Sequence, residues 1–215
     1  MEFVEFPKIA RLSRNCVITE KIDGTNAQVS IRRESDPETE AVREYLEFGI
    51  DTQVSLDDGA VAFVRAGSRT RWISTQDDNF GFAKWVYANA HELAKLGEGS
   101  HFGEWWGSGI QRGYGLEKGE KRFSLFNTAR WSVDAVRPAC CSVVPVLYSG
   151  IFDIRSVNFA LDTLSLYGSQ AATGFKDPEG IIIWHEAAQL YFKKTIRKDE
   201  EWKGKANAQP QREAA

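Results

Sequence analysis

The 215-residue chain has little of several features that would assign a protein to a class. It contains only three cysteines, two of them adjacent, and no CxxC pair, which argues against a disulfide framework or a structural zinc site. No run of about eighteen apolar residues occurs, which argues against a membrane-spanning helix. Residues 1–5 lack the basic and apolar regions of a secretory signal. We therefore expect a cytoplasmic protein without a membrane partner.

Basic charge is not in excess either. Lysine and arginine number 27 against 30 acidic residues, so the formal net charge is -3. This excludes a globally basic protein that coats nucleic acid, although a local basic groove remains open. Hydrophobic residues make up 42% of the chain, which is enough for one substantial core. We expect one domain over residues 1–197 and a polar tail over residues 198–215.

Alternation of apolar and polar residues predicts short strands. Residues 17–31 alternate on both sides of Asp23-Gly24, which predicts two strands joined by a tight turn with Lys21 at its mouth. Aromatic or β-branched runs predict further strands at residues 60–66, 101–106, 123–126, 143–147, 181–184 and 190–196.

Helical spacing occurs in two places. Apolar residues recur at helical intervals after the capping residues 77–79 until Gly97, and residues 152–167 could form a second helix. The charge-rich residues 32–58 read as a surface insertion with a short helix near residues 41–48. Together these elements predict an α+β domain whose strands deliver polar residues into a cleft.

Charged side chains interrupt apolar strands at a few points. Lys21 lies beside the turn, Glu104 stands in an aromatic strand, and Glu179 precedes the apolar residues 181–183. A lone acid that enters a buried strand usually needs a partner or a metal. Lys193 and Lys194 follow on the last predicted strand.

In this order, the segments resemble the covalent nucleotidyltransferase superfamily, which contains the ATP-dependent DNA and RNA ligases and the mRNA capping enzymes. Lys21-Ile22-Asp23-Gly24 matches its K-x-D/H-G motif. The other matching segments are residues 68–71, 102–104, 123–127 and 179–182, and the lysine strand. The resemblance covers about residues 6–198, and its ordered motifs are specific only in combination.

Two features make the chain most similar to small phage and bacterial RNA ligases. Asn26 stands where DNA ligases and capping enzymes usually carry arginine, and about twenty residues follow the lysine strand, too few for a five-stranded barrel. The resemblance therefore implies an ATP-grasp-like ligase adenylation domain. Its antiparallel or mixed sheets would be flanked by a few helices, with no oligonucleotide-binding (OB) barrel.

The implied activity begins with a covalent Lys21-AMP. A free lysine has a pKa of about 10.4 and is almost entirely protonated at neutral pH. The pKa of Lys21 must therefore be lowered by neighbouring cations, a bound metal or burial before the amine can attack ATP. AMP would then pass to a 5′-phosphate, and a 3′-hydroxyl would seal the ends. The alternatives are a DNA nick ligase, a capping-type nucleotidyltransferase, and a non-catalytic module that binds nucleotide or nucleic acid.

The resemblance also implies roles for single residues. Glu179 would help to hold Mg²⁺ or Mn²⁺, Lys193 and Lys194 would contact the α-phosphate, and Glu104 would contact the ribose. Further nucleotide contacts are implied for the main chain near Glu20 and Ile22 at the adenine edge, for Asn26 and Arg69 at the ribose and phosphate, and for Phe123, or alternatively Phe126, against the adenine face.

Two questions about the site stay open in the sequence. The superfamily commonly has Lys-x-Lys on its last strand, whereas Lys193 and Lys194 are adjacent and would point oppositely unless a bulge turns both inward. The other question is how RNA, or DNA, ends are held. Residues 111–122 with Arg65, Arg69 and Arg71 are candidates for that contact, and a protein partner is a further candidate source of specificity.

Overall fold

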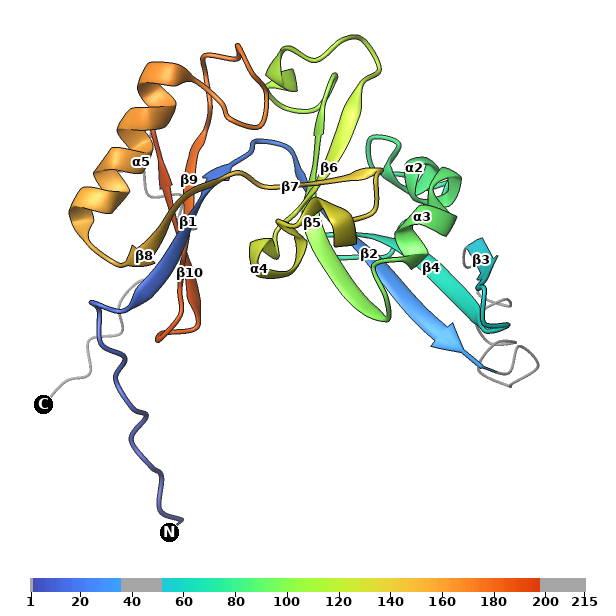
Figure 1. The fold of residues 1–215 in the computed structure, drawn as a ribbon, viewed down its shortest axis with the longest axis horizontal. Coiled ribbons are helices and arrows are strands. Elements are labelled where there is room, and N and C mark those ends of the chain that lie inside the picture. Colours follow the sequence, from blue (N-terminus) through green and yellow to red (C-terminus); the bar gives the residue numbers. More distant parts are fainter. Residues whose placement is uncertain (1, 36–51, 198–215) are drawn as a thin grey trace, which may run out of the picture.

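Two antiparallel or mixed sheets form the body of the protein in a computed structural model that describes residues 2–35 and 52–197 (Figure 1). The short helix expected near residues 41–48 and the tail expected at residues 198–215 lie outside the described residues. The α+β class is confirmed, and the described residues form no separate OB barrel. None of the helices in this part of the chain is both long and apolar enough to cross a bilayer.

The first sheet has the strand order β10-β9-β1-β8, and all its pairs are antiparallel. Its strands are β1 (Asn15–Lys21), β8 (Val146–Ile151), β9 (Gly180–His185) and β10 (Leu190–Thr195). The helix α5 (Ile154–Tyr167) packs on one face, where alternate residues such as Ile18 and Ile181 are buried against Leu164. Because strand side chains alternate, the intervening residues Thr19 and Lys21 face the other way.

The second sheet has the order β3-β4-β2-β5-β6-β7, with only β6 and β7 parallel. Its strands are β2 (Thr25–Glu34), β3 (Thr52–Ser55), β4 (Val61–Ser68), β5 (Gly99–Gly107), β6 (Lys121–Leu125) and β7 (Cys141–Val143). The helices α2 (Phe82–Ala88) and α3 (Ala90–Ala94) cover one face and bury the main core. Shorter helical turns are α4 (Thr128–Trp131), η1 (Gly113–Gly115) and η2 (Asp134–Val136).

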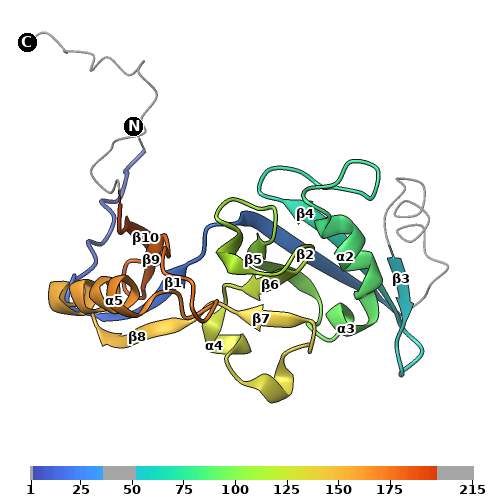
Figure 2. The ribbon, with the colours of Figure 1, turned by 90° about the horizontal axis from the view of Figure 1, so that it is seen from above.

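The chain crosses between the sheets at two adjacent points (Figures 1 and 2). The predicted hairpin at Asp23-Gly24 is wrong, because β1 pairs with β8 and β9, whereas β2 pairs with β4 and β5. Residues 144–145 make the return crossing from β7 to β8, and the Glu20 N–H donates to the Pro145 carbonyl at 2.9 Å. We call residues 22–24 and 144–145 together the joint.

Gly24 is required at the joint for close approach. A Cβ at this position would lie 2.5 Å from the Trp105 carbonyl oxygen and 2.7 Å from the Trp106 Cβ. Glycine alone lets the backbone pass this close to β5.

Two other sequence predictions change in detail. The helix expected up to Gly97 is interrupted at Asn89, where the backbone leaves helical geometry between α2 and α3. The strand expected at residues 143–147 is split between β7 and β8, because the return crossing falls within it.

Candidate active site

A cleft of about 1220 Å³ lies between the two sheets. Residues of β1, β9 and β10 line one wall, and residues of β2, β5 and the α4 segment line the other (Figure 1). The predicted site residues that line it are Glu20, Lys21, Ile22, Asn26, Arg69, Glu104, Phe126 and Lys193. The cleft therefore collects side chains from both sheets at the joint.

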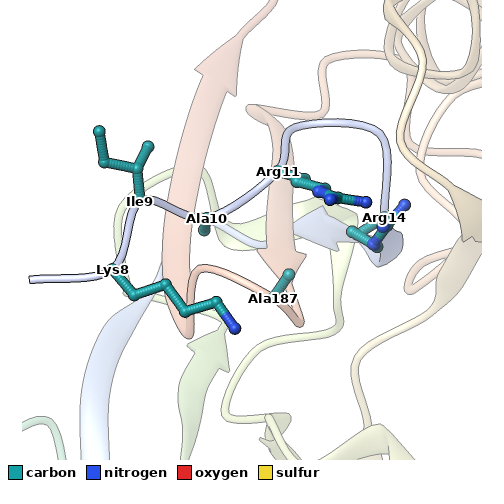
Figure 3. A pocket seen from close by; sticks show the side chains of 6 residues that line it. All are labelled: Lys8, Ile9, Ala10, Arg11, Arg14 and Ala187. Carbon is teal, nitrogen blue, oxygen red and sulfur yellow. The ribbon is translucent and has the colours of Figure 1, made fainter.

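A smaller hollow of about 540 Å³ lies at the N-terminal segment (Figure 3). It is lined by Lys8, Ile9, Ala10, Arg11, Arg14 and Ala187. This lining holds cations but no carboxylate and none of the predicted site residues. The chemistry that the sequence predicts therefore belongs to the cleft.

Lys21 is the last residue of β1, directly before the joint, and its Nζ forms an ion pair with Glu179 Oε2. The pairing of β1 with β9 explains the contact, because Lys21 lies opposite Gly180, the residue after Glu179. Both side chains are about four-fifths buried, at 23% and 18% exposure. The amine and the predicted metal ligand thus meet, although 158 residues separate them in the chain.

Glu104 lies on the cleft face of β5, opposite Asn26 on β2. Its Oε1 accepts a hydrogen bond from the Gly24 N–H at 3.1 Å. The pKa of Glu104 is raised to about 7, mainly by burial and in smaller part by the charges of Glu179 and Asp23, while Lys21 and the Gly24 N–H oppose the shift. Acidic groups therefore crowd around the amine, in a place where a cation would relieve their repulsion.

A network of polar side chains fixes the joint beside this cluster. The Asp23 N–H donates to the buried Tyr114 hydroxyl at 2.8 Å, and Arg112 Nε donates to Asp23 Oδ2 at 2.9 Å. Arg112 Nη1 also donates to the Asp177 carbonyl oxygen at 2.9 Å, two residues before Glu179. Burial raises the pKa of Tyr114 above its ordinary value, so its hydroxyl stays neutral.

Sequence reasoning assigned residues 111–122 to RNA and missed this positioning role. The available signal was Tyr114 between Gly113 and Gly115, a pattern typical of a tight turn, and all three have positive φ. Of the arginines predicted to guide RNA, only Arg69 lines the cleft. Arg71 pairs with Asp77, and the Arg65 guanidinium lies 4.3 Å from the centroid of the Trp72 ring.

Glu20 is almost fully buried, at 1% exposure. Its Oε2 accepts from the Gln170 and Ala171 N–H groups at 2.8 and 3.0 Å, so the carboxylate holds the loop after α5. Burial raises the pKa of Glu20 above its ordinary value, opposed by these hydrogen bonds. The contact with adenine was predicted for the main chain near Glu20. The hydrogen bonds of the Glu20 side chain therefore neither support nor contradict that prediction.

The two adjacent lysines lie on opposite faces of β10. The register between β10 and β9 is regular from Leu190 to Thr195, so no bulge turns both amines inward. Lys193 pairs with Ile182 and lines the cleft, whereas Lys194 pairs with Ile181, whose side chain packs toward α5. The structure therefore brings only Lys193 to the site, with Thr195 as its neighbour on the same face.

Phe123 lies in the core and does not line the cleft. Its ring packs against Phe82 and Trp85, with centroids 5.1 and 5.7 Å apart, on the face covered by α2. The first choice for the ring against adenine therefore does not fit, because Phe123 and Glu104 occupy opposite faces of the sheet. The alternative, Phe126, is half-buried, follows β6 and lines the cleft.

The acidic groups fit one kind of metal site. Among the described residues, no three His, Cys, Asp or Glu side chains converge as a ligand set. Mg²⁺ commonly binds through one or two carboxylates together with substrate phosphates, and Glu179 and Glu104 beside Lys21 offer oxygen ligands of that kind. A divalent cation here would offset the negative charges of Glu179 and Asp23, which add to the effect of burial on the Glu104 pKa.

Comparison with known proteins assigns the family. The family model described as RNA ligase matches residues 14–198, which is most of the chain. This chain belongs to the RNA ligase family. No curated protein matches it in sequence.

Solved structures of an RNA ligase from Naegleria gruberi share the fold. A mutant of that ligase with ATP and Mn has a TM-score of 0.52 at 16% identity, and the match covers 85% of this chain and 50% of the ligase. An apo mutant gives 0.53 at 16% identity over 85% and 49%, and a mutant with AMP and Mn gives 0.52 at 17% over 85% and 49%. The chain thus spans about half the length of these ligases.

Proposed function

We propose that this chain is an ATP-dependent RNA ligase that forms a covalent Lys21-AMP intermediate. The observation that carries the proposal is the position of Lys21, which lines the cleft and whose amine contacts Glu179 near Glu104. Membership of the RNA ligase family supports it. The Naegleria ligase, which was solved with ATP and with AMP, supplies the analogy for the nucleotide.

In the first step, the Lys21 amine attacks the α-phosphorus of ATP. A P–N bond forms, the bond between the α-phosphorus and the bridging oxygen breaks, and pyrophosphate leaves. Glu179 Oε2, which contacts Nζ, is placed to receive the proton that the amine loses. Lys193 on the same wall supplies positive charge for the α-phosphate.

Glu179 would hold Mg²⁺ or Mn²⁺ together with the phosphates. The metal would neutralise charge on the phosphate oxygens and on the leaving pyrophosphate. The cleft residues themselves orient the two reactants. The network of Arg112 with Asp23 and Asp177 keeps the joint and the segment before Glu179 in register.

The second and third steps would join RNA ends in the same cleft. A 5′-phosphate oxygen attacks the phosphorus of Lys21-AMP, the P–N bond breaks, and a phosphoanhydride forms. A 3′-hydroxyl then attacks the 5′-phosphorus, a phosphodiester forms, and AMP leaves. Arg69, exposed at the cleft, can pair with a terminal phosphate through its planar guanidinium.

Adenine would lie between the two walls. Phe126 lines one wall and Ile182 the other, and an aromatic ring with an aliphatic side chain can cover both faces of a purine. Asn26 and Glu104, which face each other across β2 and β5, would contact the ribose. We also propose that the cleft selects RNA over DNA and one kind of end over another, with any protein partner contributing to this selection.

Intact-mass measurement after mixing the protein with ATP and Mg²⁺ tests the first step. We expect the mass of one AMP to be added, with release of pyrophosphate, and Lys21→Ala to abolish the addition. Lys84→Ala, which removes an exposed lysine on α2 that does not line the cleft, is the matched control and should label like the wild type.

The labelled protein would then be offered 5′-phosphorylated RNA and, separately, 5′-phosphorylated DNA. We expect AMP transfer and sealing with RNA ends. Transfer only to DNA nicks would favour the nick ligase, and labelling by GTP in place of ATP would favour a capping-type enzyme. Nucleotide binding without pyrophosphate release would favour the non-catalytic module and overturn the proposal.

A further inference from the structure

Two aromatic side chains on the wall formed by the first sheet have no role in the steps above. Trp184 on β9 pairs with Tyr191 on β10, their ring centroids are 4.5 Å apart, and both line the cleft. Tyr191 is 66% exposed, so one face of the pair is open to solvent. An exposed aromatic pair inside a cleft is a stacking surface that the fold does not fill.

The register places this pair beyond the adenine position. Lys21 lies opposite Gly180, Thr19 opposite Ile182, and Val17 opposite Trp184. We call each set of residues that lie opposite one another across the strands a row. At about 3.3 Å per strand residue, the row of Trp184 lies about 13 Å from the row of Lys21. Adenine held against Ile182 would occupy the row between them and leave the outer row uncovered.

The size of the cleft and its opposite wall agree with a second occupant. Its volume of about 1220 Å³ exceeds the range of about 300–1,000 Å³ that is usual for a small-molecule site. Phe102, half exposed on β5, lines the wall on the side of the second sheet. Aromatic rings therefore stand on both walls of the cleft.

The aromatic side chains at the Trp184 row favour a nucleobase whose face is free. Duplex bases already stack on each other, so an aromatic platform takes up bases of single strands. Charge alone would not hold a polynucleotide here, because the cleft is lined by Arg130 and Lys193 but also by the carboxylates of Glu98 and Glu186. Stacking would thus provide most of the affinity in this part of the cleft.

We propose that Trp184 and Tyr191 form a stacking site for an unpaired base of the RNA, a few nucleotides from the end that Lys21-AMP activates. The inference rests on the proposed function, which it deepens by naming single-stranded RNA ends as the substrate class. At a rise of about 3.4 Å per stacked nucleotide, 13 Å corresponds to about four nucleotides.

The test is the binding of a fluorescent, 5′-phosphorylated single-stranded RNA of eight nucleotides, followed by anisotropy without ATP. We expect Tyr191→Ala to weaken binding by about 10-fold, within the range for loss of one aromatic–base stack, and Tyr191→Phe to restore it. The factor should be similar at 50 and 200 mM salt. It should vanish for a dinucleotide and for a blunt duplex.

Phe192→Ala is the matched control, because Phe192 is the next residue on β10, is half exposed, and pairs with Ile183 on the opposite face. It should bind RNA like the wild type. Equal weakening by both variants, or no weakening by Tyr191→Ala, would overturn the stacking site.

Self-adenylation separates this inference from the proposed function. If Tyr191→Ala slows formation of Lys21-AMP as much as it weakens RNA binding, the pair serves ATP and the inference fails while the ligase assignment stands. If the wild type forms no Lys21-AMP, the ligase assignment fails, and the RNA-binding assay still decides whether the pair stacks on a base.

Discussion

Glu104 provides a test of the electrostatics of the cleft that needs no substrate. The folded protein holds the proton on Glu104 up to a pKa of about 7, whereas an unperturbed glutamate has a pKa of 4.5. Between these values the folded state binds one more proton than the unfolded state. The free energy of unfolding therefore falls as pH rises through this window, by about 1.4 kcal/mol per pH unit.

Replacing Glu104 with glutamine keeps the shape of the side chain and removes the titration. Over the whole window the wild type loses about 3 kcal/mol of stability through this group, and above pH 7 the loss is complete. We expect Glu104→Gln to become more stable relative to the wild type by about that amount between pH 4.5 and pH 8. Other groups with raised pKa values, such as Glu20, act in both proteins and cancel in the difference.

Urea unfolding at constant ionic strength, without ATP or Mg²⁺, measures the effect at pH 4.5, 6, 7 and 8. Glu117→Gln makes the same replacement at an exposed position and controls for the loss of one charge. Parallel curves for the wild type and Glu104→Gln would refute the reasoning, because the buried carboxyl would then titrate alike in both states.

Two further predictions concern packing, at Gly24 and at the two phenylalanines Phe123 and Phe126. Gly24→Ala should destabilise the fold by about 1–3 kcal/mol in urea unfolding, because its Cβ would lie 2.5 Å from the Trp105 carbonyl oxygen, and it should slow formation of Lys21-AMP; a variant of unchanged stability would contradict the close approach. Phe123→Ala should cost about 3–5 kcal/mol of stability, whereas Phe126→Ala should mainly weaken ATP binding, by about 10-fold in isothermal titration. The reverse pattern would return the adenine contact to Phe123.

The sequence predicts where strands lie better than which strands pair. Alternation located β1 and β2, and runs of aromatic or β-branched residues located β5, β9 and β10, to within a few residues, because both signals are local properties of the sequence. It also suggested a hairpin at Asp23-Gly24. The choice of partner depends on residues more than a hundred positions away, such as Ile182 opposite Thr19, and no local pattern contains that information.

In the candidate site, too, the sequence located the segments better than the faces that their side chains occupy. The order of the motifs, through the family resemblance, assigned Lys21 and Glu179 to one site, and the structure brings the two side chains into an ion pair. The choice between Phe123 and Phe126 depended on which face of β6 meets the cleft, and the choice between Lys193 and Lys194 on whether β10 contains a bulge. Both are matters of register, which is fixed by pairing across the sheets and not by the segment itself.

The position of the joint has a mechanical consequence. The two crossings, at residues 22–24 and 144–145, are adjacent and contribute residues to the lining of the cleft, and Lys21 directly precedes the first of them. If the sheets change their angle about these crossings, groups near them move least, and groups farther along the strands, such as Tyr191, move more. The Lys21 amine and Glu179, the carboxylate that it contacts, would then keep their spacing while the two walls of the cleft move apart.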